Sequence, residues 1–443
     1  MMTLDRGKKS VYTSKWNAQQ DSKDTWLKAR LDALNYYRGR TREYVIDYFS
    51  DSTLAKVCVS NINICKRIID RVSLVYQVAP KREVTSDKYI DLIKNKDEKL
   101  QRAERLCNLL ELILIKPSWR NDRIEYEIIT DFEPSFGDDP LEPESFTYPL
   151  ARRDEVTNND PQLWAYWSVD EHFIYDKSQD DKKVPNDWED ANPYGIIPLI
   201  PVFRDGRPEE SYLDTDASID LIQSNLAINV ASTTAMANVM FQSFGYMWVA
   251  GEVDNQHLEV APDKITKLQV DSNMGVVTPP NTITSVDSFI KSQYRMLAQN
   301  YHLSTSFVEG NEQNVSGISL MVRNQELLDA RKSDLERWKN VEAKLFELEK
   351  VIAHAHSGID IGAMEYVDFS ESIEVLDDKT QRERDEWDLS KGLIDEIDIL
   401  VRRNPDWNRE EAEEYLAERK KSKAMVRSKG DTEENIFNLG RDY

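Results

Sequence analysis

Apolar residues recur every three or four positions in several long stretches of the chain, which is the pattern of amphipathic helices. The longest stretch runs from Ile318 to Ile352 and is followed by Gly358, a residue that favours a helix end. Its apolar positions are Leu328, Leu335, Trp338, Val341, Leu345, Leu348 and Ile352. The single stripe predicts one long helix. Its width favours the spine of a globular domain over an autonomous coiled coil.

Three further stretches have helical spacing. Residues 60–79 repeat apolar positions in this way, with Ser60 or Asn61 available as the N-cap. Residues 208–244 contain no Gly or Pro after the opening proline, and the two acids that follow this proline suit a helix N-terminus. Residues 284–303 form another amphipathic stretch. The sequence therefore predicts helices over 60–79, 208–244 and 284–303.

Between these helices the pattern changes to that of strands. Residues 105–203 alternate apolar and polar positions and are rich in Ile, Tyr, Trp and Phe, which predicts a β-rich region. The polar, Pro-containing stretch 137–161 inside it predicts a loop, and 106–115 indicates a buried helix or strand. Residues 245–283 predict strands and turns, and 365–375 predict a short strand. Helices and strands in separate runs indicate an α+β fold.

From residue 377 the chain has a charged, helical pattern and ends in a polar tail. With 443 residues the chain is too long for one ordinary core, and two to four structural units are expected. Its net charge of −23 comes from 80 acidic and 57 basic residues. Such a balance argues against a static basic groove for nucleic acid and against binding to anionic membranes. It is compatible with a protein that lets DNA pass without holding it.

The cysteines and the N-terminal segment indicate a reducing compartment. The three cysteines, Cys58, Cys65 and Cys107, form no C-x-x-C pair, so free thiols are expected. Residues 1–16 are charged and have no apolar core, so no signal peptide is expected. The longest apolar run, 106–115, is half the length that a membrane helix needs.

No motif in the chain predicts catalysis, a metal or a cofactor. The "GKKS" at 7–10 resembles the end of a phosphate-binding loop, but there is no room for the glycine that would precede it. His354 and His356 are two residues apart in the long helix and point to different faces, so they cannot chelate one ion. Paired acids such as 138–139 and 377–378 are expected by chance among 80 acids. Two alternatives remain open, a metal-dependent DNA-processing enzyme and an intracellular coiled-coil scaffold.

The order of the predicted parts resembles the portal proteins of tailed bacteriophages. The resemblance is carried in sequence by "NPYGIIPLIPVFRDG", "EESYLDTDASIDLIQSNLAINVASTTAMAN", "VDSFIKSQYRMLAQNYHLS", "NVSGISLMVRNQELLDARKSDLERW" and "KGLIDEIDILVRRNPDWNREEAEEYLAE". It covers roughly 200–425, while over 1–200 only "SNINICKRIIDRVSLVYQ" and the β pattern agree. One departure is Asp395, which stands where Ser or Thr is common in the family.

The resemblance implies a portal-like α+β fold with a β-rich and helical wing, an antiparallel helical stem, a small β clip, a long spine helix and a helical crown. The implied segments are the wing at 1–207, the first stem helix at 208–244, the clip at 245–283, the second stem helix at 284–303, the tunnel loop at 304–317, the long helix and strand of the wing at 318–376, and the crown and tail at 377–443.

The resemblance also implies a function. Portal proteins form a homo-oligomeric ring, usually a dodecamer, at one capsid vertex of the virion. Double-stranded DNA passes non-specifically through the ring during packaging and ejection. The implied partners are the terminase large subunit, the major capsid and scaffolding proteins and the tail adaptor proteins. The ring would assemble in the host cytoplasm, with no membrane, no cofactor and no enzymatic activity of its own.

The segment "FVEGNEQNVSGISL" would then be the end of the tunnel loop and the start of the long helix. The implied channel residues are Ser304, Thr305, Ser306, Glu309, Gly310, Asn311, Glu312, Gln313 and Asn314. The acids among them would repel phosphates and limit sticking of DNA, which needs no base-reading side chains. The implied packing residues of the first stem helix are Ala227, Ala231 and Ala235, small side chains that let helices approach closely. The implied docking residues of the clip are Trp248, Lys264 and Lys267.

Overall fold

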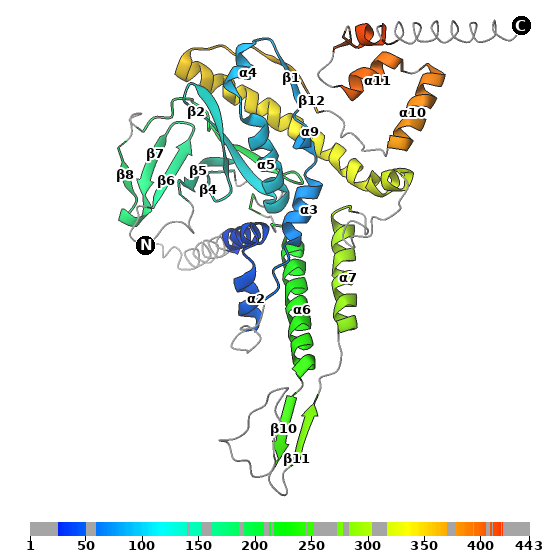
Figure 1. Cartoon of the computed structure of the whole chain (residues 1–443). Helices are drawn as coiled ribbons and strands as arrows, with labels where there is room; N and C mark the ends of the chain where they lie inside the picture. The colour runs from blue at the N-terminus through cyan, green and yellow to red at the C-terminus, as the bar shows by residue number, and fades with distance from the viewer. Residues whose placement is uncertain are drawn as a thin grey trace, which may run out of the picture. The chain divides into compact units, whose positions relative to one another are not determined.

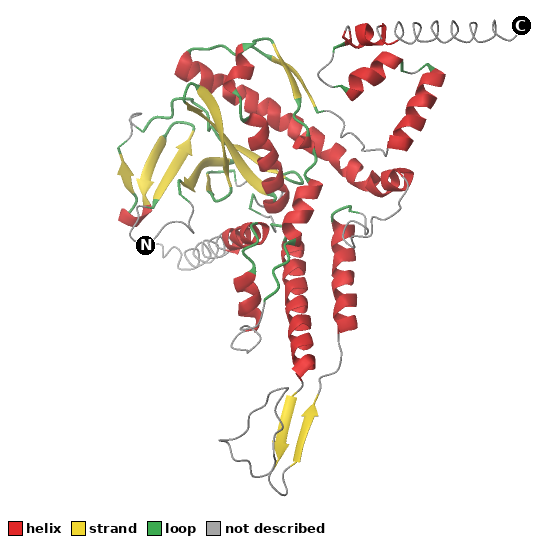
Figure 2. Cartoon of the chain, in the orientation of Figure 1, coloured by secondary structure: helices red, strands yellow, loops and turns green. Residues whose placement is uncertain are grey.

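The computed structural model has an α+β fold, with helices and antiparallel sheets (Figure 1, Figure 2). The chain divides into two compact units, one from 1–312 and 324–372 and one from 313–323 and 373–443. The structure describes residues 25–49, 59–139, 142–151, 162–185, 190–207, 212–213, 217–244, 246–250, 273–277, 283–303, 317–369, 378–392, 394–404, 408–409, 411–417 and 419.

The main core of the first unit lies among helices from distant parts of the chain. These are the helix at 25–37, α2 (Arg42–Phe49), α3 (Ile64–Val72), α4 (Lys88–Leu92), α5 (Lys96–Leu110) and α9 (Gly317–Ser357). The predicted helix at 60–79 is shorter than expected, because Asn63, rather than Ser60 or Asn61, caps α3 by accepting a hydrogen bond from the amide of Lys66. Residues 59–63 before this cap lie outside any helix.

The apolar run at 106–115 contains both a helix end and a strand. Helix α5 ends at Leu110, and β2 (Leu112–Arg120) begins after the single residue Glu111. Glu111 has a φ of 63° and its amide donates to the carbonyl of Cys107, which closes the helix in the left-handed conformation. The run is mostly apolar because both the helix end and the first half of the strand are buried.

Strand β2 is the centre of a three-stranded antiparallel sheet in the order β3-β2-β9, with β3 (Arg123–Ile129) and β9 (Ile200–Phe203) on its two sides. Successive side chains of a strand point to opposite faces. Ile113 and Ile115 therefore join the main core, while Leu112 and Leu114 join a second, smaller core. Burial on both faces explains why this strand reads as a continuous apolar run.

A second sheet has five antiparallel strands in the order β4-β5-β6-β7-β8. They are β4 (Glu133–Phe136), β5 (Pro143–Pro149), β6 (Leu163–Ser168), β7 (His172–Asp176) and β8 (Lys182–Val184). The prediction of a loop over 137–161 is wrong for β5. Its prolines stand at the two ends of the strand, and between them Phe146 and Tyr148 are buried in the second core.

The long helix is confirmed, and α9 extends a little beyond the predicted range to Ser357. Gly358 follows it with a φ of 66°, a backbone conformation in which glycine meets no steric penalty. Trp338, Leu345 and Ile352 are buried in the main core, so α9 is the spine of a globular unit, as predicted. After it, β12 (Met364–Asp368) pairs antiparallel with β1 (Lys81–Val84).

The helices predicted at 208–244 and 284–303 are α6 (Ile219–Phe244) and α7 (Ile283–Asn300). The expected start of the first helix at Pro208 is wrong, because α6 begins at Ile219. Tyr212 is instead buried among aromatic rings of the second core, and Ala217 and Ser218 have left-handed φ values of 48° and 52°. Two strands follow α6, β10 (Tyr246–Ala250) and β11 (Asn273–Val277), and they pair antiparallel before α7.

The second unit contains α10 (Asp378–Lys391), α11 (Glu396–Arg403) and a helical turn at 411–417. Asp395 is the N-cap of α11, and it exchanges backbone-to-side-chain hydrogen bonds with Asp398 in a capping box. Aspartate caps a helix as well as Ser or Thr, so Asp395 is a good N-cap for α11.

Candidate functional site

Helices α6 and α7 form an antiparallel pair, and the β10–β11 hairpin lies between them in the chain (Figure 1). Asp220 at the start of α6 fixes the end of α7, because it accepts hydrogen bonds from the Tyr301 hydroxyl at 2.9 Å and from the Asn300 amide at 3.1 Å. Leu297 and Ala298 of α7 are buried in the main core. The helix pair is therefore anchored at one end to the rest of the first unit.

One side of α6 holds the extended segment before α3 through a row of polar side chains. Asn225, Asn229 and Thr233 stand four residues apart and are fully buried. The Asn229 Oδ1 atom accepts from the amide of Ile62 at 2.6 Å, and its Nδ2 atom donates to the carbonyl of Ile62 at 2.9 Å. The Asn225 carboxamide oxygen accepts from the Ile64 amide at 2.9 Å, and the Thr233 hydroxyl accepts from Ser60 N at 3.0 Å. These side chains therefore make the hydrogen bonds that a neighbouring strand would otherwise make to the backbone of residues 60–64.

Apolar side chains extend outward from the helix pair. On α6, Met236 and Val239 are 38% and 47% exposed, and on α7, Phe289 and Met296 are 44% and 46% exposed. Each pair lies on one face of its helix, at spacings of three and seven residues. Large apolar side chains on a surface are ordinary when they are scattered, but here two exposed pairs occur on helices that contact each other. We call these four residues the outer face of the helix pair.

The three alanines predicted to pack between neighbouring subunits, Ala227, Ala231 and Ala235, are half-buried positions of α6. Within the chain, Ala237 and Thr233 are buried instead. Part of the small-residue pattern is therefore explained by contacts inside the chain.

In the hairpin, Trp248 pairs with Gly275 and remains 44% exposed. A Cβ atom at Gly275 would lie 2.7 Å from the indole Nε1 atom of Trp248. The indole can therefore pack against this position only because Gly275 has no side chain. Lys264 and Lys267, predicted with Trp248 as docking residues, lie outside the described residues. So do all the channel residues predicted in the tunnel loop, from Ser304 to Asn314.

A buried ionic cluster fixes α9 to the N-terminal part of the first unit. The Lys96 ammonium lies 3.0 Å from Glu342 and 2.8 Å from Glu349, and all three side chains are fully buried. Arg82 makes two hydrogen bonds to Glu342, at 2.7 and 3.1 Å. A buried charge requires partners of opposite charge. Here Glu342 and Glu349 are those partners, and they lie seven residues apart on α9.

Tyrosine hydroxyls complete this cluster. Tyr89 and Tyr126 donate to the two oxygens of Glu349 at 2.8 and 2.6 Å, and Tyr76 donates to Glu342 at 2.9 Å. Burial opposes ionisation of Glu342, but the nearby Lys96 and Arg82 outweigh it and lower the pKa of Glu342 to about 2. The cluster is closed by its own partners and leaves no group free for a substrate. Its effect is to set the position of α9.

The remaining titratable groups of interest are also enclosed. Burial raises the pKa of the Cys65 and Cys107 thiols to about 12, so neither is a nucleophile at neutral pH. Burial raises the pKa of Glu104 to about 7, although its two oxygens accept hydrogen bonds from the amides of Val75 and Tyr76. His356 accepts or donates a hydrogen bond at 2.8 Å with the Tyr194 hydroxyl.

Within the described ranges, no three His, Cys, Asp or Glu side chains gather as a metal site would require. Among the described helices, none combines the length and apolar character needed to cross a bilayer.

Sequence reasoning missed the buried ionic cluster and the polar row of α6. The row has a visible signal, since Asn225, Asn229 and Thr233 repeat every fourth residue of the helix. The cluster has a weaker one. Glu342 and Glu349 each adjoin an apolar position of α9, but the sequence alone does not pair them with Lys96, more than 200 positions away.

The sequence matches no protein-family model and no curated protein.

Proposed function

We propose that this chain is the subunit of a phage portal ring, the channel for genome packaging and ejection at one capsid vertex. The observation that carries the proposal is the antiparallel pair of α6 and α7 with the β10–β11 hairpin between them, followed by the 41-residue helix α9. In the portal fold that the sequence resembles, these are the stem, the clip and the spine helix, in this order.

The outer face of the helix pair supplies the reason to assemble. Met236 and Val239 of α6 and Phe289 and Met296 of α7 expose apolar surface in a chain of net charge −23. Contact with the neighbouring subunit's helix pair would remove this surface from water. Because a ring repeats one heterologous contact, one patch on each side of the subunit is sufficient.

In this proposal the tunnel loop at 304–317 lines the channel, and Glu309 and Glu312 keep DNA from sticking to it. The hairpin with Trp248 forms the docking region for the terminase large subunit and the tail adaptors. Capsid and scaffolding proteins surround the ring, which contains no cofactor and catalyses no reaction. An apolar interface combined with an acidic chain fits a channel that must hold together while DNA slides through it.

The test is the oligomeric state and its symmetry. Purified full-length protein, or protein recovered from capsids, should give rings with a central hole in end-on negative-stain images. Light scattering should give a mass of many subunits, twelve in the capsid-derived material. Monomers or dimers in both preparations would overturn the proposal. Metal-dependent DNA cleavage by protein free of any motor would favour the DNA-processing alternative.

A further inference from the structure

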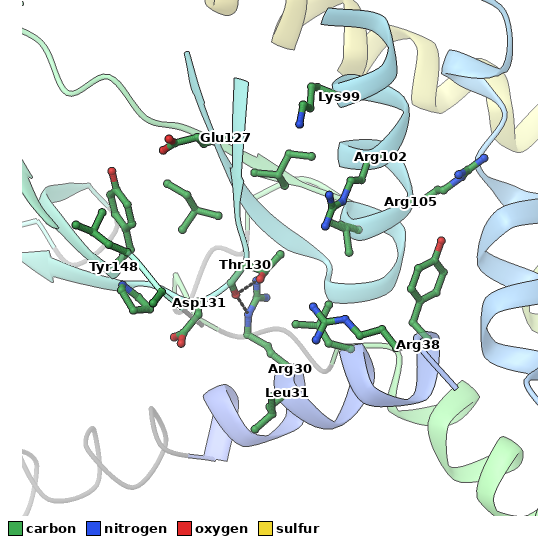
Figure 3. A pocket seen from close by; sticks show the side chains of 18 of the residues that line it. Arg30, Leu31, Arg38, Lys99, Arg102, Arg105, Glu127, Thr130, Asp131 and Tyr148 are labelled. Atoms are coloured by element: carbon green, nitrogen blue, oxygen red, sulfur yellow. Dashed lines mark hydrogen bonds between the residues drawn. The ribbon is translucent and has the colours of Figure 1, made fainter. Parts of the chain in front are cut away.

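A cavity of about 1180 Å³ lies between the helix at 25–37, α5 and the strands β3 and β5 (Figure 3). Among the described residues that line it, seven are basic and three acidic, although the whole chain carries a net charge of −23. The cavity therefore reverses the sign of charge that prevails over the rest of the molecule. A local excess of cations in an acidic protein attracts a partner that the remaining surface repels.

Several of these cations have no partner within the described part of the chain. Lys28 of the N-terminal helix and Lys99 and Arg102 of α5 make no ion pair or side-chain hydrogen bond with a described residue. Lys99 and Arg102 are three residues apart and so lie on one face of α5. Figure 3 shows them along the same side of the cavity as Arg38, with Glu127 and Tyr148 across from them.

The walls of the cavity are held in place independently of these cations. Arg30 is buried, and its guanidinium donates to the carbonyls of Thr130 at 3.0 and 2.9 Å and of Leu110 at 2.9 Å. These bonds tie the helix at 25–37 to the end of α5 and to the residue after β3. The site is therefore preformed, which lowers the entropic cost of binding.

The apolar lining decides between possible occupants. It is mainly aliphatic and includes Leu31, which is 41% exposed, with Leu34, Leu106 and Ile129 buried around it. Single-stranded nucleic acid is held mainly by stacking on aromatic rings, and among the described lining residues only Tyr37 and Tyr148 are aromatic. An aliphatic lining beside a row of cations fits a peptide helix with one acidic and one apolar face.

We propose that this cavity is a docking site for an acidic amphipathic segment of a partner protein. Its carboxylates would pair with Lys28, Lys99 and Arg102, and its apolar side chains would cover Leu31. The volume exceeds that of most small-molecule pockets, as a peptide requires. The proposal is independent of the portal function, since it uses none of the surfaces on the helix pair.

The test is binding of a designed peptide to the full-length protein. The probe is a fluorescent helix of about 14 residues, roughly 21 Å long, with Glu on one face and Leu on the other. Its controls are the same helix with Lys in place of Glu, a scrambled sequence of equal composition, and a labelled oligothymidylate. We expect anisotropy to report binding of the acidic helix with a Kd on the order of 10 µM, weakening as salt rises.

The double variant Lys99→Glu/Arg102→Glu should weaken binding at least about tenfold. The matched variant Lys88→Glu/Lys94→Glu reverses two exposed charges outside the cavity. It should change the Kd for the acidic helix less than about twofold. Leu31→Ser should also weaken binding, which a purely electrostatic contact would not predict. Thermal melts of each variant check the fold.

Four results would overturn the proposal: no binding of the acidic helix, equal binding of the scrambled peptide, equal losses in the two double variants, or tighter binding of the oligothymidylate with the same dependence on Lys99 and Arg102. A change of oligomeric state in Lys99→Glu/Arg102→Glu would assign the cavity to a second copy of this chain instead. The four binding results do not bear on whether the protein forms rings.

Discussion

Lys96 joins two glutamates that belong to a helix far away in the sequence. Its ammonium contacts Glu342 and Glu349, and none of the three side chains is exposed to solvent. A cluster of this kind costs desolvation energy, and its partners compensate for that cost only when all are present. Its value is specificity: α9 can take one rotation and one position along its axis, because only there do both glutamates meet Lys96.

Lys96→Met should destabilise the protein by roughly 3–5 kcal/mol at pH 7, because it leaves the buried carboxylates with too few cations. The difference from wild type should shrink as the pH falls. In the wild type the stability due to Glu342 is present above its usual pKa of 4.5 and is lost toward about 2. In the variant Glu342 lacks its Lys96 partner, so it accepts a proton at a higher pH and ceases to be an uncompensated charge.

Urea denaturation followed by tryptophan fluorescence, at pH 7 and pH 4, measures this effect. Lys94→Met is the matched control, since Lys94 is exposed just before α5, and it should stay within about 0.5 kcal/mol of wild type. A Lys96→Met protein as stable as the control at pH 7 would show that the cluster does not hold α9.

Glu104 gives a pH dependence of the opposite sign. Burial raises its pKa from 4.5 to about 7 in the folded protein. The folded state then binds the proton more tightly than the unfolded state, so this contribution is present at low pH and is lost as the pH rises from 4.5 to 7. The loss amounts to roughly 3 kcal/mol. In Glu104→Gln this loss should be absent.

The measurement is the free energy of unfolding of both proteins at several values across this pH range. Gln places an amide donor against one of the two backbone amides that Glu104 accepts from, so the variant starts from a lower stability. The test is therefore the slope of the free energy of unfolding against pH, and not its absolute value. Parallel curves for wild type and variant would contradict the role of Glu104.

At the scale of elements, α6 has different roles along its length. Nearer its start, Asn225, Asn229 and Thr233 contact the backbone of the segment before α3. Beyond them Met236 and Val239 are exposed, and Met236 lies three residues after Thr233 on the same face of the helix. The small and polar residues in the middle of this helix suggest packing against a neighbouring subunit, but three of them are occupied within the chain. The contacts proposed between subunits therefore involve the exposed part of α6 beyond Thr233.

Asn229→Ala should cost about 1–3 kcal/mol, because the fully buried Asn229 side chain makes two hydrogen bonds to the backbone of Ile62 that the variant loses. Gln223→Ala, at an exposed position of the same helix, controls for the substitution itself and should be nearly neutral. Hydrogen exchange provides the specific readout, since the amide of Ile62 should exchange faster in Asn229→Ala. Unchanged protection of that amide would mean that the row of polar side chains does not hold the segment.

At the scale of the whole molecule, the outer face of the helix pair should control assembly. Met236→Glu/Val239→Glu places charges where the proposed ring requires burial, and we expect folded subunits that form no rings. Thr284→Glu adds a charge at an exposed position of α7 and is the control, expected to assemble normally. Circular dichroism checks the fold and light scattering the mass. Rings of normal mass from the double variant would exclude this face as the interface.

The sequence by itself determined the features that depend on local periodicity. Residues 318–352 have one apolar stripe, and α9 is a helix there; 284–303 and α7 agree closely. Hydrophobic spacing is a property of neighbouring residues, so it survives without knowledge of the fold. The same reasoning gave a wrong helix boundary where contacts with residues far away in the sequence determine the local structure. Pro208 and the acids after it look like a helix start, but the burial of Tyr212 among distant aromatic rings delays α6 to Ile219.

Only the tertiary structure decided which residues far apart in the chain meet. The apolar run at 106–115 indicates burial, but its division at Glu111 depends on the two cores that β2 separates. The pairing of Lys96 with Glu342 and the cavity lined by Lys99 and Arg102 bring together segments that no local pattern connects. The net charge of the sequence predicts an acidic surface, because a sum of charges does not say where each charge lies in the folded protein. Folding concentrates a few cations in one place, and that local field decides what the cavity can bind.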